Sequence, residues 1–527
     1  MNRRALLRGA LGVAAGRALD AVAKTQGQEQ AQETGPPVVG GTPRVALADV
    51  PLTLDAARTD QLAAWWVAQQ LYDPPMRETP RGGVVAGLVL DALPAADGFA
   101  YTLPLRPGVR FHDGQLLRAR DVAASLERVR DPAVGGINAW RLEHVAAIET
   151  PDERTVTLRL ATPNVALPVL LASPVMGILP EGVIADGDPF TVERPPVGTG
   201  PFAFAAWGGR GELSLMRNPA SWQPGLPFLD GIQFQYLVED TARTTAMVTG
   251  AVDAIQSAPL LDVAILADDT SVGLIGGVSR RVCGLVLNLR GGALADVRLR
   301  RLVARSIDRE ALVAAATGGQ ATAQATLFPD DHWAHLAVPT PAPDTAAVLA
   351  DLAALGYPAG LRLSLICPEQ DPSLANASVL LQEQFARAGI AATLELLDAR
   401  SLAEAVAASA FDLLIGYRGP WLDPHELVRP LVASDGVANL SGYANPTVDG
   451  QIAAAVAPAD LETRVERYRA IQELLLVDVP WITLFLPNHY HAVTAQIAGM
   501  RAYPSGSLYG LRRAWALPVA PDETAGD

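Results

Sequence analysis

Side chains that perform covalent chemistry are scarce in this sequence. The 527 residues include two cysteines, seven histidines and, among 41 basic residues, a single lysine, Lys24. The chain beyond residue 24 therefore offers no lysine for a Schiff base, a phosphate-binding P-loop or a Ser–Lys dyad. G-x-S-x-G and H-E-x-x-H motifs are also missing from the sequence. We predict no catalytic residues and no cofactor, and we do not expect an enzyme.

Cysteines and histidines remain as candidates for metal or redox chemistry. Cys283 and Cys367 lie in apolar runs, which predicts buried free thiols, and the C-x-x-C spacing of metal sites does not occur. No acidic third ligand is evident beside the pairs His332/His335 and His489/His491, so we expect surface or cap residues there. His425 follows Asp423-Pro424 and can be either a helix-start residue or a residue that contacts a ligand. We predict no directly bound metal ion.

The composition bounds the class of protein. Half of the residues are hydrophobic and 18% are charged, which is typical of a globular chain, and a length of 527 residues calls for two or three lobes. A net charge of −15 argues against binding to nucleic acid, which needs a basic surface. After the N-terminus there is no uncharged apolar run long enough to span a membrane.

The first 39 residues are predicted to comprise an export signal and a linker. Residues 2–8 (NRRALLR) resemble a twin-arginine signal, residues 10–15 are weakly apolar, and residues 21–23 (AVA) offer a cleavage site. We therefore expect a signal peptide at 1–23 and a polar linker at 24–39, with the basic N-terminus of a cytosolic protein as the alternative. No cysteine lies there to take a lipid anchor, so a lipoprotein is not expected.

Hydrophobic periodicity predicts the elements that would position functional side chains. Alternation predicts strands at 101–105, 155–160 and 232–237, and a 3.6-residue period predicts helices at 121–131 and, from an N-cap at Asp240, just after the third strand. In the second half, strand 361–366, helix 379–389 and strand 391–397 indicate a largely parallel sheet. Strand 411–417 would deliver the next loop to the carboxyl edge of that sheet, where open α/β sheets bind ligands. A last helix is expected from Asp460 to about 477.

Residues 101–132 (YTLPLRPGVRFHDGQLLRARDVAASLERVRDP) closely resemble the signature of family 5 extracytoplasmic solute-binding proteins. Further blocks resemble the same family: VGTGPF at 197–202, PFLD at 227–230, GAVD at 250–253 and SIDRE at 306–310. The glycines of the first block are expected to let the backbone pass close to another segment. The resemblance covers about residues 40–515. These proteins are the peptide, oligopeptide and nickel receptors of bacterial ABC importers.

The resemblance implies an α/β, two-lobed periplasmic-binding-protein ("Venus flytrap") fold, class II, of the large cluster with an extra subdomain in lobe I. Lobe I would comprise 40–275, with the extra subdomain at about 60–170, and a return segment at 484–527; lobe II would comprise 276–483. The implied function is a monomeric extracytoplasmic receptor that captures a peptide-like or other polar small molecule between its lobes and delivers it to ABC permease subunits. A signalling or chaperone-like binding protein without transport is the alternative from another class.

The same resemblance nominates ligand-contact residues. Residues 49–55 (DVPLTLD) resemble a loop that lies at the ligand cleft in the family, which nominates Pro51, Leu52 and Thr53. Trp65, in a helix expected at 61–72, could face the ligand or pack in the core. From the second lobe we nominate residues around two strand ends: Glu369, Asp371, Tyr417, Arg418, Trp421 and His425.

The resemblance also bears on the ligand. The W-x-x-D pattern that pairs with a peptide ammonium aligns with residues 417–420, where its aspartate is replaced by Pro420, and residues 367–372 lack the arginine of dipeptide receptors. Weak binding of unmodified dipeptides is therefore expected. Residues 419–425 (GPWLDPH) resemble the nickel-type GAPYDPH with Leu422 inserted, so His425 could contact a chelated metal. The partner arginine of that type is missing, since residues 137–138 are Ile-Asn. A nickel-chelate or opine-type receptor is the alternative within the family.

Overall fold

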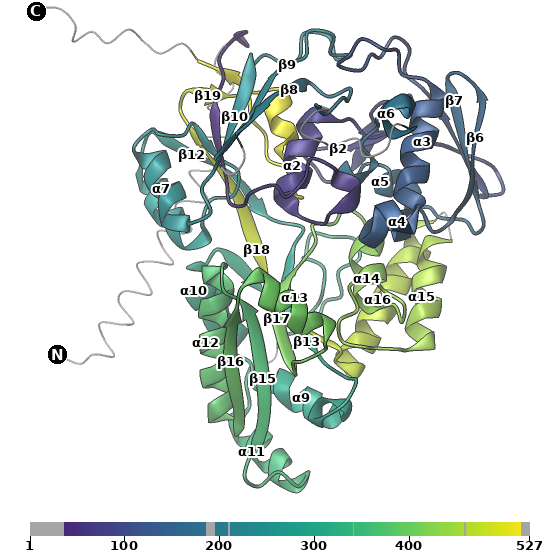
Figure 1. Cartoon of the computed structure of the whole chain (residues 1–527). Helices are drawn as coiled ribbons and strands as arrows, with labels where there is room; N and C mark the ends of the chain where they lie inside the picture. Colours follow the sequence, from purple (N-terminus) through teal and green to yellow (C-terminus); the bar gives the residue numbers. More distant parts are fainter. Residues whose placement is uncertain (1–35, 186–194, 209–210, 341, 458–459, 518–527) are drawn as a thin grey trace, which may run out of the picture. The chain divides into compact units, whose positions relative to one another are not determined.

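The computed structural model describes residues 36–185, 195–208, 211–340, 342–457 and 460–517 (Figure 1). The predicted signal peptide and residues 24–35 of the predicted linker lie outside these ranges. Among the described helices, none combines the length and the apolar character that crossing a membrane requires. The described chain divides into two compact units: an N-terminal unit, 36–277 with 489–517, and a central unit, 278–488. The chain therefore passes twice between units, at 277/278 and at 488/489.

The central unit is built on a mixed sheet in the order β16-β15-β17-β13-β18, with β14 also paired to β18. Its strands are β13 (Val282–Leu287), β14 (Ala321–Ala323), β15 (Leu361–Pro368), β16 (Ile390–Leu397), β17 (Leu413–Arg418) and the first part of β18 (Trp481–Thr494). Its helices are α9 (Val297–Arg305), α10 (Arg309–Thr317), α11 (Thr345–Ala354), α12 (Pro372–Arg387), α13 (Ala399–Ala407), α14 (Pro424–Val432), α15 (Pro446–Val456), α16 (Leu461–Asp478) and the 3₁₀ turn η5 (Ala293–Ala295).

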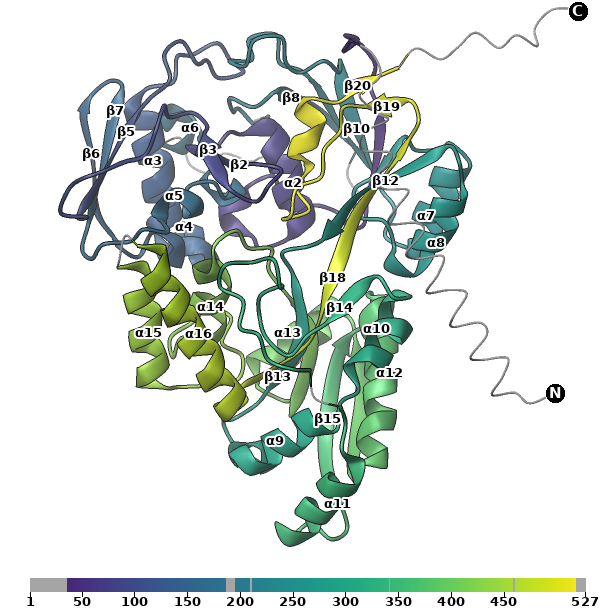
Figure 2. The same ribbon diagram turned by 180° about the vertical axis from the view of Figure 1, so that it is seen from behind.

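Alternation along these strands gives the central unit two cores, one on each face of the sheet. Leu413 and Ile415 of β17 pack with residues of α9 to α12, whereas Leu414, between them, packs with residues of α14, α15 and α16. Figures 1 and 2 show α10 and α12 side by side, and α14, α15 and α16 as a separate group. The strands are apolar on both faces because both faces are covered by helices.

The N-terminal unit contains a sheet in the order β18-β11-β1-β10-β9-β8, to which β12 adds through β18, and a smaller sheet in the order β4-β5-β7-β6. Its strands are β1 (Arg44–Leu47), β2 (Met76–Glu78), β3 (Val84–Ala86), β4 (Leu93–Pro94), β5 (Ala100–Pro104), β6 (Val145–Asp152), β7 (Thr155–Leu160), β8 (Phe202–Trp207), β9 (Glu212–Arg217), β10 (Gly231–Tyr236), β11 (Ala254–Ile255), β12 (Val272–Val278), β19 (Ile497–Ala498) and β20 (Trp515–Ala516). Its α-helices are α2 (Leu62–Leu71), α3 (Ala119–Arg130), α4 (Pro132–Gly135), α5 (Leu167–Leu170), α6 (Glu181–Ala185), α7 (Asp240–Val248) and α8 (Val263–Asp268). Its 3₁₀ turns are η1 (Ala56–Arg58), η2 (Gly136–Leu142), η3 (Pro174–Met176), η4 (Leu260–Asp262) and η6 (Leu508–Arg512).

Two glycines allow close packing inside the N-terminal unit, as the sequence predicts. A Cβ on Gly198 would lie 2.1 Å from the carbonyl oxygen of Leu71, and one on Gly200 would lie 2.3 Å from that of Gln70. Both distances are shorter than any real carbon–oxygen contact. The end of α2 and the segment before β8 can therefore touch only because these two positions carry no side chain.

Three expectations about local structure are wrong in detail. The central sheet is parallel only across β16, β15 and β17, because β13 pairs antiparallel to both β17 and β18. The helix expected at 379–389 begins at Pro372, since the carboxylate of Asp371 accepts a hydrogen bond from the backbone N–H of Leu374 and caps it. Asp240 lies inside α7 and pairs with Arg243, and the N-cap position belongs to Glu239.

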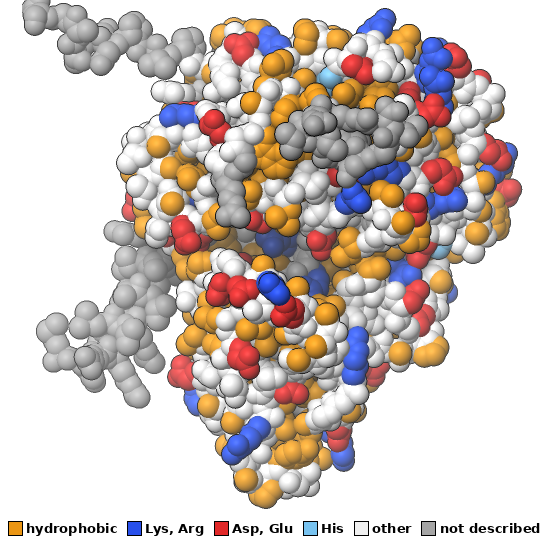
Figure 3. Space-filling view, in the orientation of Figure 1, with side chains coloured by type: hydrophobic (Ala, Val, Ile, Leu, Met, Phe, Trp, Pro, Cys, Tyr) orange, Lys and Arg blue, Asp and Glu red, His pale blue; other side chains and the backbone are white. Residues whose placement is uncertain are grey.

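Surface charges follow the acidic composition without separating by sign on the face that Figure 3 shows. Acidic and basic side chains are intermixed there, with hydrophobic side chains between them. This is the usual pattern of a solvated protein surface. The two cysteines, Cys283 and Cys367, are free thiols and are buried, as the sequence predicts.

Candidate functional site

One edge of the central sheet gathers charged side chains from three segments that are distant in sequence. Because β17 runs parallel to β15 and antiparallel to β13, the ends of β15 and β17 and the start of β13 meet at the same edge. This edge carries Arg281, Glu369, Asp371, Tyr417 and Arg418, which we call the strand-end cluster. It is the carboxyl edge of the parallel strands, where open α/β sheets bind their ligands.

Tyr417 lies at the centre of the strand-end cluster. The guanidinium carbon of Arg281 lies 4.4 Å from the centre of its ring, a cation–π contact. Burial raises the pKa of Tyr417 well above its usual value, and the charge of Asp371 raises it further, against the opposing effects of Arg281 and of a hydrogen bond with Ser373. The phenol is therefore neutral at physiological pH, and charge at this edge comes from its neighbours.

The acidic members of the cluster differ in exposure. Glu369 is exposed, and its carboxylate accepts a hydrogen bond from the side chain of Gln370 at 3.2 Å. Asp371 is half-buried and caps α12 through a 3.0 Å bond from the N–H of Leu374. A capping carboxylate is fixed in direction by the helix that it caps, so Asp371 is the better positioned of the two.

Arg418 closes the strand-end cluster at the end of β17. Its Nη1 donates to the carbonyl oxygen of Tyr417 at 2.8 Å, and its guanidinium carbon lies 5.6 Å from the centre of the Trp481 ring. Both contacts turn the side chain back onto its own sheet. Arg418 therefore lies along the edge, and these contacts within the central unit help to hold it there.

The loop after β17 is anchored to the residues that precede β13. The N–H of Trp421 donates to the carbonyl oxygen of Arg280 at 3.2 Å. Gly419 has a φ of +99°, and a Cβ there would lie 2.5 Å from the carbonyl oxygen of Arg280, so only glycine fits this crossing. The two segments that flank Tyr417 are therefore fixed to each other through their backbones.

Trp421 and His425 are both buried beyond this crossing. The indole of Trp421 packs edge-on against Phe328 and His332, with ring centres 5.1 and 5.0 Å away. His425 is buried in the first turn of α14, and its N–H donates to the cap residue Asp423 at 2.9 Å. The carboxylate of Asp423 accepts two 2.8 Å bonds from Arg464, so this turn is pinned to α16.

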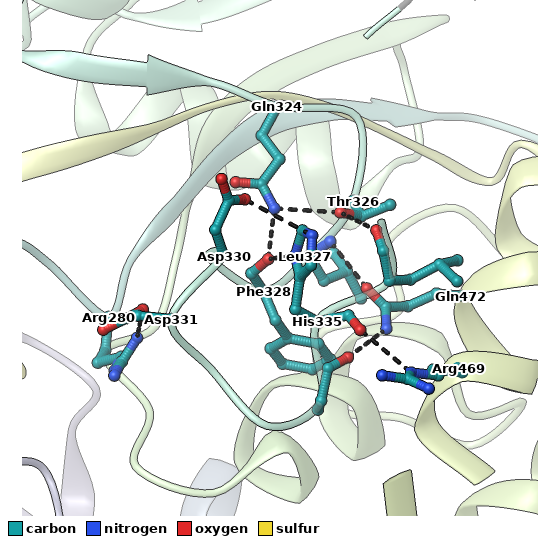
Figure 4. A network of polar contacts seen from close by, with 12 residues as sticks. Arg280, Gln324, Thr326, Leu327, Phe328, Asp330, Asp331, His335, Arg469 and Gln472 are labelled. Carbon is teal, nitrogen blue, oxygen red and sulfur yellow. Dashed lines mark hydrogen bonds and ion pairs between the residues drawn. The ribbon is translucent and has the colours of Figure 1, made fainter. Parts of the chain in front are cut away.

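Residues 324–335 form the wall behind Trp421, and Figure 4 shows the polar contacts that hold them. Gln472 of α16 donates to the carbonyl oxygen of Ala334 at 2.9 Å and accepts from the N–H of Leu327 at 3.2 Å. Between these two contacts in the sequence, Asp331 pairs with Arg280 at 3.3 Å. The segment is therefore tied both to α16 and to the entrance of β13.

A buried ion pair holds the nominated loop of the N-terminal unit, residues 51–55. Pro51 is buried, Leu52 is 79% exposed, and the hydroxyl of Thr53 accepts from the N–H of Asp55 at 3.0 Å. Asp55 pairs with Arg128 of α3, and both side chains are buried. Separating a buried ion pair would leave an unpaired charge in the core, so Asp55 stays bound to Arg128. This holds the backbone of residues 51–55 in place while the side chain of Leu52 remains exposed.

Trp65 belongs to the core of the N-terminal unit. Its indole N–H donates to the carbonyl oxygen of Thr59 at 2.9 Å, and the guanidinium of Arg141 lies 5.7 Å from its ring centre. Asn138 donates to the same carbonyl oxygen at 2.9 Å. Of the two roles left open by the sequence, the observed contacts are those of core packing.

A family model described as "Bacterial extracellular solute-binding proteins, family 5 Middle" matches residues 83–439. The chain belongs to this family. As a family 5 protein it is a solute-binding receptor of the kind that serves ABC importers, and it acts outside the cytoplasm.

Similar proteins support the same fold. The glutathione-binding protein GsiB of Salmonella typhi is 27% identical over 421 residues, 77% of this chain and 81% of that protein. The structure of the PBP AgaA of A. tumefaciens R10 in complex with agropinic acid has a TM-score of 0.82 at 24% identity and covers 91% of this chain and 99% of that one. The ABC transporter-associated periplasmic binding protein DppA from Helicobacter pylori, in complex with peptide STSA, has a TM-score of 0.83 at 19% identity and covers 91% and 98%. The family 5 receptor thus has the predicted α/β, two-lobed periplasmic-binding-protein fold.

Expectations about the histidines of the family 5 receptor need correction. His332, His489 and His491 are buried, so their predicted surface placement is wrong. Burial, helped by the charge of Arg280, lowers the pKa of His332 to about 4, and burial lowers that of His491 to about 4. The imidazoles of His332 and His491 are therefore neutral, and that of His332 packs between aromatic rings, tilted against Phe328 and edge-on to Trp421.

Sequence reasoning missed Arg281 as a site residue of the family 5 receptor. Residues 280–281 form an Arg-Arg pair directly before β13, which begins at Val282, and charged residues at a strand entrance are ordinary surface features. Only the pairing of β13 with β17 brings Arg281 onto Tyr417. The sequence contains the Arg-Arg pair, but only the order of the strands shows that Arg281 lies beside Tyr417.

Proposed function

We propose that this receptor captures a polar small molecule or modified peptide and does not clamp the free termini of an ordinary dipeptide. One observation carries the proposal: the loop that leaves the strand-end cluster continues through Pro420, which brings no carboxylate for a ligand ammonium. The acidic side chains at this edge are Glu369, which is exposed, and Asp371, which caps α12. The basic ones both contact Tyr417: Arg281 lies over its ring, and Arg418 donates to its carbonyl oxygen. These guanidinium groups supply donors that an anionic group of a solute could accept from, whereas no aspartate stands where the W-x-x-D pattern places one for an ammonium.

The ligand-contact residues are proposed as two sets. Glu369, Asp371, Tyr417 and Arg418 would contact the solute from the central unit, and Leu52 with Thr53 from the N-terminal unit. The exposure of Leu52 and the fixed backbone beneath it support a contact role. We propose that Pro51, Trp65, Trp421 and His425 act mainly by holding these residues in place, since all four are buried.

Binding of simple peptides tests the proposal. Isothermal titration of the mature receptor with L-Ala-L-Ala should give no measurable heat of binding at concentrations up to the millimolar range. Native mass spectrometry of receptor purified from its own periplasm should show a retained solute that is not a mixture of short unmodified peptides. Recovery of such a mixture would restore an ordinary peptide receptor and would end this proposal.

A nickel-chelate or opine-type receptor is the second candidate, and the run at residues 419–425 favours it. His425 ends that run and is buried at the start of α14. AgaA, which has the same fold, was solved with agropinic acid, a ligand that is not a peptide. Titration of wild type and His425→Ala with Ni²⁺–histidine would distinguish a nickel-chelate receptor from an opine-type receptor. Only a nickel-chelate receptor should bind this probe and lose affinity when the imidazole is removed.

We further propose how the protein is organised and exported. Lobe I would comprise 40–275, with the extra subdomain at about 60–170, and 484–527; lobe II would comprise 276–483. Export would use the twin-arginine route with cleavage near residue 23, giving a periplasmic monomer that is not a lipoprotein and has no catalytic activity. The order of residues 2–23 and the family's extracellular character support this route.

A further inference from the structure

Two adjacent arginines lead into β13, and they have different partners. Arg280 pairs with Asp331 at 3.3 Å, as Figure 4 shows, and its guanidinium carbon lies 5.3 Å from the centre of the Trp421 ring. Arg281 is half-buried, and among the described residues no carboxylate lies within ion-pair distance of it. Its Nε is shielded from solvent and has no hydrogen-bond acceptor in that part of the chain. The charge of Arg280 is therefore balanced by Asp331, whereas no carboxylate of the described residues balances the charge of Arg281.

The position of Arg281 is fixed by its surroundings. Its guanidinium stacks on the ring of Tyr417 at 4.4 Å, and its Cα lies 3.4 Å from where a Cβ on Gly419 would be. The hydrogen bond from Trp421 to the carbonyl oxygen of Arg280 holds the adjoining backbone. A planar guanidinium laid against the ring of the half-buried Tyr417 keeps its orientation, so its donors are presented in a defined direction.

An arginine that is partly withdrawn from solvent and has no ion-pair partner is expected to bind an anion. Withdrawing a charge from water without a partner is costly, and orphaned buried donors are rare in native proteins. Asp371 acts on the same Tyr417 through its charge, but it lies beyond the 4 Å limit of an ion pair with Arg281. A carboxylate matches the fork of guanidinium donors and would supply the acceptor that Nε of Arg281 lacks.

We propose that Arg281 binds a carboxylate of the transported solute and that the receptor selects solutes carrying one. This inference rests on the proposed function, because it names the chemical class of solute that the strand-end cluster takes. The neutral phenol of Tyr417 provides a platform for the guanidinium and adds no competing charge. Selection would therefore depend on the anionic group of the solute and on Arg281.

The test combines variants of the protein with variants of the ligand. Mature receptor is unfolded and refolded to remove any solute, and is then titrated with agropinic acid and glutathione, each as the free acid and as its methyl ester. The same receptor is incubated with a small-molecule extract of its own cells and analysed by native mass spectrometry. The variants are Arg281→Gln and Arg281→Lys, with Arg280→Gln as the matched control, since that residue is adjacent and already paired with Asp331.

A carboxylate bound by Arg281 should lose about 10- to 100-fold in affinity in Arg281→Gln, the usual loss for a charge-assisted hydrogen bond. Esterification should weaken binding to wild type by a similar factor and should have little further effect on Arg281→Gln. Arg280→Gln should remain within about twofold of wild type, and Arg281→Lys should retain part of the affinity. If Arg281→Gln does not fold, the affinities of the wild-type receptor for each free acid and for its methyl ester test the inference instead.

Equal affinity of wild type and Arg281→Gln for an acid, or retention from the extract of a solute without a carboxylate, would overturn the inference. Retention of ordinary short peptides whose binding still depends on Arg281 would overturn the proposed function and leave the anion role standing. A receptor that retains nothing from the extract and binds neither probe would count against both.

Discussion

Removing the carboxylate of Asp423 should destabilise the central unit by about 3–5 kcal/mol, the typical cost of leaving one member of a buried ion pair unpaired. Asp423 and Arg464 are joined at 2.8 Å, with side chains only 6% and 11% exposed. In Asp423→Ala the guanidinium of Arg464 would stay between Trp333 and Tyr468, its centre 5.0 and 5.7 Å from their rings. The lost N-cap of α14 would add about 1 kcal/mol.

Hydrogen exchange in increasing urea, read by mass spectrometry on peptides from α14 and α16, would measure this loss. A local readout is needed because a chain with two compact units need not unfold in one step. The double variant Asp423→Ala/Arg464→Met should recover at least half of the lost stability, since it removes both charges together. The matched control is Glu404→Ala, which breaks the exposed pair of Arg400 and Glu404 and should cost under about 0.5 kcal/mol.

Two results would refute this reasoning. A loss below about 1 kcal/mol in Asp423→Ala would mean that the pair contributes no more than a surface pair does. A double variant as unstable as the sum of its two single variants would mean that the charges do not depend on each other.

Three further predictions follow from the structure and the sequence. The pKa of His332 is lowered to about 4, so the unfolded chain binds more protons between pH 4 and about 6.5; stability should fall as the pH drops through this range, and His332→Gln should flatten the slope measured by urea unfolding. Gly200→Ala would place a Cβ 2.3 Å from the carbonyl oxygen of Gln70, so the melting temperature should fall or soluble protein should be lost, whereas Gly182→Ala, with no atom within 4 Å, should be neutral. Replacing Arg3 and Arg4 by lysine should retain the precursor in the cytoplasm on immunoblots of cell fractions, and unchanged export would argue against the twin-arginine route.

Local sequence patterns predicted the elements well because each depends on neighbouring residues. Alternation at 155–160 gave β7 with the observed bounds, and Asp460 caps α16 as its residue type and place suggest. The same holds for Gly198 and Gly200, whose spacing before a proline indicated a close backbone crossing. Such signals need no knowledge of what the segment packs against.

The candidate site was harder to predict because its members meet only through strand order. His332 looks like a surface residue until Phe328 and Trp421, the latter far along the chain, enclose its ring. Arg281 becomes a site residue only once β13 pairs with β17, and periodicity does not reveal whether two strands run parallel or antiparallel. The residues at 369–371 and 417–418 were nominated through the family resemblance, which places ligand contacts around the ends of two apolar strands.

The divided N-terminal unit sets an order of assembly. Asp73 is fully buried and pairs with Arg512 at 2.5 Å, across a sequence separation of 439 residues, and the carbonyl oxygen of Leu508 accepts from Gln70 at 3.0 Å. During synthesis these groups wait for their partners until the entire central unit has been made. The central unit is one continuous stretch, 278–488, and has no such wait. In the newly made chain the central unit would thus fold first, and the N-terminal unit would be completed only when residues 489–517 pack against residues 36–277.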